Sequence, residues 1–163
     1  DLAFRTILMF ESRLEKRNIT LEGLDSEPVQ VLGDPDLIGQ VIYNLFENAT
    51  KFVNTGGTIT FTFKDEPNST SIAIRNTGAG ISKEELPKIF ERFYKSDDSR
   101  SHDKTGLGIG LDITKHIVRL HKAQISVSSE EGEYTEFLIR LPKKDAPAES
   151  PTENPEKQPK DAR

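Results

Sequence analysis

The sequence predicts a two-layer α/β sandwich, in which a mixed, mostly antiparallel sheet of about five strands carries three main helices on one face. Two observations lead to this fold class. Segments that alternate between apolar and polar residues are separated by segments with helical periodicity, which indicates strands and helices packed as two layers. The 163 residues, 34% of them apolar, suffice for a single hydrophobic core but not for two.

The first third of the chain contains two helical patterns and two short strand patterns. Apolar residues recur with helical spacing over residues 2–14. Short alternating strands are expected at residues 19–22 and around residues 29–32. The pair Asp34-Pro35 then supplies an N-cap and a first-turn proline for a long helix that ends near residue 53.

The middle of the chain indicates a β-hairpin followed by a capped helix. Residues 58–63 and 71–75 alternate as strands, with turn-forming residues at 66–69 between them. Ser82 and Glu85 have the spacing of a capping box, which predicts a helix that carries residues 89–93.

The remaining elements are a loop, a helix and a second strand pair. A polar, glycine-poor loop is expected at residues 95–104, followed by a glycine-rich start and a helix that reaches His121. Residues 125–129 and 136–141 alternate as strands, and Gly132 marks the turn between them.

Composition excludes several classes of function. The net charge of −5 argues against nonspecific binding of nucleic acid. The absence of cysteine excludes disulfides, thiolate metal sites and a thiol nucleophile, and is compatible with a reducing compartment. No apolar run approaches the ~20 residues of a membrane span, and the first residues do not resemble a signal peptide. We therefore expect the chain to be soluble. Because it starts at Asp1 without an initiator methionine, we also expect it to be an excised fragment.

Residues 143–163 differ in composition from the rest of the chain. They contain no Val, Ile, Leu or aromatic residue, and proline recurs at every fourth position from Pro147 to Pro159. Such a segment cannot bury enough apolar surface to offset the entropy lost on ordering. We expect one domain over residues 1–142 and a disordered tail over 143–163, with docking through the prolines as the alternative.

Three separated segments have the residue types needed to bind the phosphates of a nucleotide. Glycines let backbone N–H groups approach phosphate closely, and asparagine side chains can supply hard oxygen ligands to Mg²⁺. The glycine-rich segment matches neither the P-loop pattern nor the dinucleotide-binding pattern. The segments are Asn44-Leu45-Phe46-Glu47-Asn48-Ala49-Thr50-Lys51-Phe52, Asn76-Thr77-Gly78-Ala79-Gly80-Ile81 and Gly106-Leu107-Gly108-Ile109-Gly110-Leu111.

Two asparagines on the long helix need an explanation beyond helix propensity. Asn44, Asn48 and Lys51 fall on one edge of the apolar stripe, although asparagine is a poor helix former. They are either nucleotide and metal contacts or partners in hydrogen bonds between the helix and a loop. Taken alone, Asn76 also has two interpretations, since a strand often ends in such a turn.

The three segments, in this order, resemble the N, G1 and G2 boxes of the ATP-binding catalytic domain of bacterial sensor histidine kinases. The stretch Ile89-Phe90-Glu91-Arg92-Phe93-Tyr94 resembles their F box. The resemblance covers about residues 1–142. It implies the Bergerat ATP-binding fold and the use of ATP and Mg²⁺.

The resemblance also assigns roles to individual residues. Asn48 falls on the family's Mg²⁺ ligand, and Asn44 falls on the other asparagine of the N box, so both are expected at the metal. Lys51 falls on a phosphate-contacting lysine. Arg92 is expected to contact the β- or γ-phosphate, with a solvated surface arginine as the alternative. These four are the expected catalytic residues. The expected nucleotide contacts are Asn48, Lys51, Phe52, Asn76, Gly78, Gly80, Ile81, Arg92, Tyr94, Lys104, Thr105, Gly106, Leu107, Gly108, Gly110 and Leu111.

The chain departs from the family pattern at three places. Asn76 stands where the family usually has an aspartate that accepts a hydrogen bond from the adenine amino group; an amide oxygen accepts the same bond without charge assistance. Lys122-Ala123 stands where a pair of glycines is common, and Tyr134 stands where a glycine is common. Helix termination at residue 122 must therefore use another geometry.

The residue type at position 44 favours phosphate transfer over ATP hydrolysis. Related ATPases of the gyrase, Hsp90 and mismatch-repair type carry a general-base glutamate at this position. An amide cannot take a proton from water near neutral pH, so fast hydrolysis is disfavoured. A site that only positions the γ-phosphate and neutralises its charge suits transfer to a nucleophile on another domain, which in this family is a histidine.

The sequence around His102 superficially resembles the acceptor motif of these kinases. An acceptor histidine must project from a dimerising helical hairpin, whereas His102 lies in the polar loop next to the glycines. We therefore expect it to contact phosphate from a lid. His116 and His121 lie in the following helix, where a cap or surface role is sufficient.

The resemblance implies the catalytic domain of a sensor histidine kinase. It binds Mg-ATP and transfers the γ-phosphate to a histidine on the dimerisation domain of the same kinase, which passes it to the receiver domain of a response regulator. The alternatives are an ATP-binding regulator such as an anti-sigma serine kinase, and a degenerate nucleotide-binding interaction module. We expect a monomeric, cytoplasmic fragment of a homodimeric, membrane-anchored kinase, with a helical hairpin preceding Asp1.

Overall fold

A computed structural model of the chain describes residues 1–91 and 110–143. Its sheet has five strands in the order β1-β2-β3-β5-β4. β1 pairs with β2 in parallel, and the other three pairings are antiparallel. The strands are β1 (Thr20–Glu22), β2 (Thr58–Asp65), β3 (Ser69–Thr77), β4 (Gln124–Glu130) and β5 (Tyr134–Pro142). The mixed, mostly antiparallel sheet of the prediction is confirmed.

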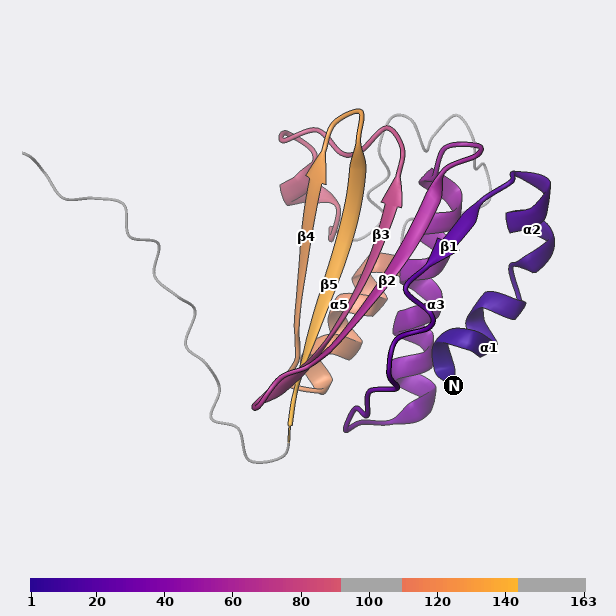
Figure 1. The fold of residues 1–163 in the computed structure, drawn as a ribbon. Helices are drawn as coiled ribbons and strands as arrows, with labels where there is room; N and C mark the ends of the chain where they lie inside the picture. Colours follow the sequence, from indigo (N-terminus) through magenta and orange to yellow (C-terminus); the bar gives the residue numbers. More distant parts are fainter. Residues whose placement is uncertain (92–109, 144–163) are drawn as a thin grey trace, which may run out of the picture.

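The helices form the second layer. α3 and α5 lie behind the sheet in Figure 1, and α1 and α2 flank α3 on the side of β1. The helical elements are α1 (Leu2–Leu8), α2 (Glu11–Lys16), α3 (Pro35–Phe52), the short 3-10 helix η1 (Leu86–Lys88) and α5 (Gly110–Leu120). In this part of the chain no helix combines the length and the apolar character needed to cross a membrane.

α3 begins and ends where the sequence predicts. The Asp34 side chain accepts hydrogen bonds from the backbone N–H groups of Asp36 and Leu37, at 2.9 and 3.0 Å, and Pro35 occupies the first turn. The helix ends because Val53 adopts an extended conformation, with φ −62° and ψ 137°. α3 is thereby fixed at both ends.

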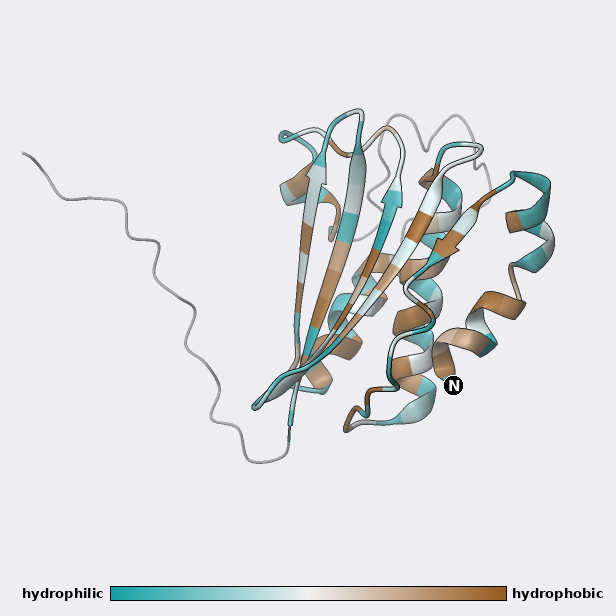
Figure 2. Cartoon of the chain, in the orientation of Figure 1, coloured by the Kyte–Doolittle hydropathy of each residue, from teal (hydrophilic) through white to brown (hydrophobic). Residues whose placement is uncertain are grey.

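Aromatic rings join three elements in the core. Phe46 on α3 is fully buried, and its ring centroid lies 5.3 Å from that of Phe10 and 5.4 Å from that of Phe61 on β2. Figure 2 shows apolar residues concentrated along the middle of the strands and polar residues at the sheet ends. Burial of aromatic rings is a main source of stability in such a core.

Three predicted elements differ from the observed ones. The predicted helix over residues 2–14 is broken after Leu8, which turns Phe10 into the core and leaves Met9 72% exposed. The predicted strand at 29–32 is wrong, since these residues form no backbone ladder with the sheet. The Thr70 hydroxyl donates a single bond to the Gln30 carbonyl.

The predicted helix after Ser82 is also shorter than expected among the described residues. The hydroxyl of Ser82 accepts from Glu85 N–H and donates to the Glu85 carboxylate, at 3.3 and 3.2 Å, so the two capping residues interact as predicted. Only η1 follows. Pro87 has no N–H to continue an α-helix and disfavours helical backbone at Leu86.

The C-terminal end of the domain is fastened to the β2–β3 hairpin. Lys143 donates its backbone N–H to Asn68 O at 2.9 Å, and its ammonium lies 2.8 Å from the Asp65 carboxylate. The rest of the predicted tail, residues 144–163, lies outside the described residues.

Candidate functional site

The edge of α3 that carries the predicted site residues changes from buried to exposed along its length. Asn44 is 7% exposed, Asn48 is half-buried, and Lys51 is exposed. Phe52, at the end of the helix, is 44% exposed. The polar edge therefore starts inside the protein and emerges at the C-terminal end of α3.

Asn44 links α3 to the start of α5. Its amide nitrogen donates to Gly110 O at 3.2 Å and to the Thr114 hydroxyl at 3.1 Å, while its amide oxygen accepts from Gln40 Nε2 at 2.8 Å. The Thr114 hydroxyl also donates to Gly110 O at 2.8 Å. Of the two interpretations of Asn44, hydrogen bonding between the helix and a neighbouring segment is present in the structure.

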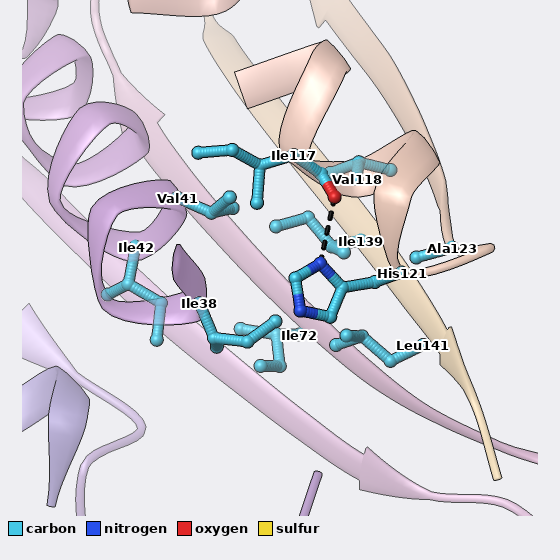
Figure 3. A pocket seen from close by; sticks show the side chains of 10 residues that line it. All are labelled: Ile38, Val41, Ile42, Ile72, Ile117, Val118, His121, Ala123, Ile139 and Leu141. Carbon is cyan, nitrogen blue, oxygen red and sulfur yellow. Dashed lines mark hydrogen bonds between the residues drawn. The ribbon is translucent and has the colours of Figure 1, made fainter. Parts of the chain in front are cut away.

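A second contact joins the opposite ends of the same two helices. His121 follows α5, and its Nε2 accepts from the N–H of Asp34, the N-cap of α3, at 3.1 Å. Its Nδ1 lies 2.9 Å from Ile117 O (Figure 3), so the ring is the tautomer with its proton on Nδ1. Residue 33 must be small here, because a Cβ on Gly33 would lie 2.7 Å from the imidazole ring. The predicted cap role of His121 agrees with this geometry.

The side chains around His121 in Figure 3 enclose a small apolar gap between α3, α5 and the sheet. Its volume is about 10 Å³, at the lower limit for one water molecule. The gap is part of the core and is not the candidate site.

These contacts define how far α5 extends along α3. The two helices run antiparallel, since the end of α5 lies at Asp34 and its start lies at Asn44. Asn48 is one turn further along α3, about 6 Å beyond Asn44 at 1.5 Å per residue. Asn48, Lys51 and Phe52 therefore lie further along α3 than Gly110, the first described residue of α5.

Glu47 lies next to Lys51 on this exposed edge. Lys51 Nζ is 3.8 Å from Glu47 Oε1, and both side chains are about one-third exposed, at 33% and 34%. A surface pair of this kind contributes little to stability.

The G1 segment is joined directly to the end of α3. Val53 and Gly78 form an antiparallel bridge, and Asn54 N–H donates to Thr77 O at 3.4 Å. Gly78 has φ 149°, and a Cβ there would lie 2.3 Å from Phe52 O. Glycine is therefore required so that the strand end can approach the helix end.

The other side of the G1 segment rests on the β4–β5 turn. A Cβ on Gly80 would lie 2.3 Å from Glu130 O, and Gly132 N–H donates to Ala79 O at 2.6 Å. Ile81 N–H donates to the Ser129 hydroxyl at 2.7 Å, and the Ile81 side chain packs on the core, as does Leu111 on α5. The segment is held on both sides, which limits its motion beneath a ligand.

Asn76 is the last helix-facing residue of β3. It is 4% exposed, and its amide nitrogen donates to Thr77 O at 3.0 Å. Among the described residues, no donor bonds its amide oxygen. Its cross-strand neighbours are Ile59 and Thr135, and Thr135 is a second buried polar residue. An amide oxygen without a protein donor can accept a hydrogen bond from another group.

Two carboxyl groups at the β2–β3 hairpin have lowered pKa values. The hydroxyls of Ser69 and Ser71 lower the pKa of Glu66, and the Lys143 ammonium lowers the pKa of Asp65. The described residues also contain no cluster of three His, Asp or Glu side chains. Metal binding here would depend on amide and phosphate oxygens.

The structure brings three of the predicted segments into contact. Asn44 joins the N box to Gly110 of the G2 box, and Val53, next to Phe52, joins the N box to Gly78 of the G1 box. The predicted residues that lie outside the described ranges are Arg92, Phe93, Tyr94, His102, Lys104, Thr105, Gly106, Leu107 and Gly108.

Sequence reasoning missed Thr114 and gave no role to Thr77, although Thr77 lies within the G1 segment. Thr114 is fully buried on the apolar stripe of α5, and a polar residue at a core-facing helical position is a signal that could have identified it. Thr77 bonds Asn54 Oδ1 at 2.6 Å and accepts from Thr58 N–H at 3.0 Å, which holds the loop between α3 and β2 against the end of β3.

A family model described as "Histidine kinase-, DNA gyrase B-, and HSP90-like ATPase" matches residues 33–145. The chain belongs to this ATPase family. The sensor protein SrrB of Staphylococcus aureus (strain NCTC 8325) is 41% identical to it over 110 residues, which are 68% of this chain and 19% of SrrB. The chain thus spans less than a fifth of that relative's length.

Solved structures of histidine kinases have the same fold. The nucleotide-free catalytic domain of histidine kinase ThkA gives a TM-score of 0.73 at 28% identity, covering 86% of this chain and 90% of that one. ThkA in complex with the response regulator protein TrrA gives 0.71 at 27% identity, covering 88% of this chain and 40% of that one. The predicted family and fold are confirmed, and the chain is a nucleotide-using catalytic domain of the histidine kinase type.

Proposed function

We propose that this domain binds Mg-ATP and transfers the γ-phosphate to a histidine of a separate dimerisation domain in the same kinase. The phosphate then passes to an aspartate of a response regulator receiver domain. The solved complex of ThkA with its response regulator TrrA supports such a partner. The proposal includes a homodimeric, membrane-anchored full-length kinase with this domain in the cytoplasm, where ATP is available.

The observation that carries the proposal is the unused acceptor of Asn76 next to a rigid glycine turn. The amide oxygen of Asn76 bonds no donor of the described residues, although the side chain is 4% exposed. Adenine presents an exocyclic amino donor that such an oxygen can accept. Phe52 is 44% exposed at the end of α3, and its backbone carbonyl lies against Gly78, two residues after Asn76.

The residues present are compatible with a magnesium ion. Mg²⁺ is usually held by one or two protein oxygens together with substrate phosphates and water, so a dense carboxylate cluster is not required. Asn48 would hold it, because this residue is half-buried one turn beyond Asn44 and its side chain makes no hydrogen bond within the described residues. When bound, the ion would neutralise phosphate charge. Asn44 would be a second ligand through the oxygen that accepts from Gln40, either by sharing that oxygen or by giving up the bond.

The geometry also supports transfer in preference to hydrolysis. Asn44 occupies the general-base position of related ATPases, and its amide is held by Gln40, Gly110 and Thr114. An amide cannot accept the proton of an attacking water. Lys51 and the start of α5 would orient the phosphates toward the exposed side, where an acceptor histidine can approach.

Labelled ATP tests the proposal. Incubated alone with Mg²⁺ and γ-labelled ATP, the domain should remain unlabelled, since no acceptor histidine is presented. Addition of the helical-hairpin domain from the same kinase should label that domain with acid-labile phosphate. Strong acid-labile labelling of this chain alone, or no labelling of the hairpin domain, would contradict the proposal.

A further inference from the structure

Arg17 joins α2 to the C-terminal end of α3. It is the half-buried C-cap residue of α2, and its two terminal guanidinium nitrogens donate to Thr50 O and Val53 O. Its own carbonyl accepts from Gly56 N–H at 2.9 Å. One residue therefore holds both the last turn of α3 and the loop that follows it.

The chemistry of a helix end explains why an arginine occupies this position. The final carbonyls of a helix have no N–H partner within the helix, and a positive charge there is favoured by the helix dipole. Val53 N–H bonds Ala49 O at 2.9 Å, so Thr50 O is the first carbonyl beyond the helical ladder. The rigid guanidinium fork can bond two carbonyls at once, which an ammonium cannot do with the same geometry.

A neighbouring arginine on α2 makes a weaker contact with the same turn. Arg13 donates to the Thr50 hydroxyl at 3.3 Å, and that hydroxyl donates to Glu47 O at 2.8 Å. Arg13 is exposed and bonds a side chain, whereas Arg17 bonds the main chain at two points. Arg13 is therefore a matched control for Arg17.

The turn held by Arg17 is the one that emerges at the candidate site. It carries Lys51 and Phe52, and Val53 bridges to Gly78 of the G1 segment. Resting on the proposed function, we propose that Arg17 is a positioning residue for nucleotide binding, which fixes this turn from α2. A displacement of α2 would then shift the last turn of α3, and with it the nucleotide site, through the Arg17 side chain.

The experiment measures Mg-ATP affinity by calorimetry and backbone hydrogen exchange in four proteins: the wild type, Arg17→Ala, Arg17→Lys and Arg13→Ala. Arg17→Ala should bind ATP about tenfold more weakly, the loss expected when a charge-assisted bond no longer orients a binding element. Arg17→Lys should recover part of the loss. Arg13→Ala should bind like the wild type. The amides of Val53 and Asn54 should exchange faster in Arg17→Ala.

A core variant in α2 separates positioning from general stability. Leu14 is 6% exposed, so Leu14→Ala lowers the melting temperature, and it removes neither of the two hydrogen bonds from the Arg17 guanidinium. At a temperature where all variants are folded, it should keep wild-type affinity. Equal losses in Leu14→Ala and Arg17→Ala would overturn the proposal, as would unchanged affinity in Arg17→Ala. If Arg17→Ala does not fold, Arg17→Lys supplies the same comparison.

Failure of the proposed function would be visible separately. A wild-type domain that binds no Mg-ATP would contradict the proposed function. The hydrogen-exchange rates of the Val53 and Asn54 amides would then be the test of whether Arg17 fixes the end of α3. Unchanged exchange of both amides in Arg17→Ala would overturn the positioning role, whatever the affinity data show.

Discussion

Replacing Asn76 with aspartate should weaken the fold and strengthen ATP binding. The buried amide nitrogen of Asn76 donates to Thr77 O at 3.0 Å. A carboxylate cannot donate, so the bond is lost and two oxygens face each other at that distance. Removing one partner of a buried hydrogen bond costs about 1–3 kcal/mol, which lowers the melting temperature of a domain of this size by roughly 3–10 °C.

The effect on the nucleotide has the opposite sign. A hydrogen bond to a charged acceptor contributes about 1.5–3 kcal/mol, and one to a neutral acceptor about 0.5–1.5 kcal/mol. The carboxylate should therefore improve adenine binding by about 1 kcal/mol, or several-fold in Kd. In Asn76→Leu the adenine amino group has no acceptor, so both the affinity and the preference for ATP over GTP should fall.

Scanning calorimetry of the nucleotide-free proteins and titration calorimetry with ATP and GTP measure both effects. The comparison needs the wild type, Asn76→Asp and Asn76→Leu. Unchanged affinity and selectivity in Asn76→Leu would place Asn76 outside the pocket. An unchanged melting temperature in Asn76→Asp would refute the role given to the bond with Thr77.

Three further predictions concern other parts of the domain. Asn44→Leu removes three neutral hydrogen bonds and should lower the free energy of unfolding in urea by about 2 kcal/mol. Gln40→Ala removes one of them and should lower the free energy of unfolding by less than about 1 kcal/mol. Equal losses in the two variants would contradict this hydrogen-bond network. Asn48→Ala should abolish phosphate transfer, while Arg92→Ala should slow transfer more than it weakens binding, and equal losses of binding would refute that division. Because the pKa of Glu66 is lowered in the folded state, its stabilisation is complete above its ordinary pKa and is lost as pH falls through the lowered value. Glu66→Gln should therefore flatten the decline of unfolding free energy below about pH 4, and an unchanged acid slope would count against the serine contacts.

The long helix and the hairpin could be predicted because their signals are local. Asp34 and Pro35 mark the start of α3 by capping chemistry that depends on adjacent residues alone. The alternation in β2 and β3 reports which face of the sheet is buried. Both signals are independent of the rest of the fold.

Elements that depend on distant contacts could not be predicted in the same way. Residues 29–32 alternate like a strand, yet no described strand pairs with them. The break after Leu8 places Phe10 against Phe46, and that contact joins residues 36 positions apart. Local periodicity contains no information about such partners.

In the candidate site, too, some features could be predicted from local sequence and others depend on distant contacts. The residue types in the three boxes identified Asn44, Asn76 and Gly78, because each belongs to a recognisable motif. The motif did not reveal that Asn44 holds α5 or that Gly78 fits beneath Phe52 O. Arg17 belongs to none of the boxes, so only the structure connects it to the site.

Titration of the domain with a fluorescent ATP analogue, with and without Mg²⁺, tests the central claim most directly. We predict saturable binding that strengthens when Mg²⁺ is present and that competes with unlabelled ATP. In Asn48→Ala the strengthening by Mg²⁺ should disappear, because the proposed ligand is absent. No binding, or equal binding in the wild type with and without Mg²⁺, would contradict a functional Mg-ATP site in this domain.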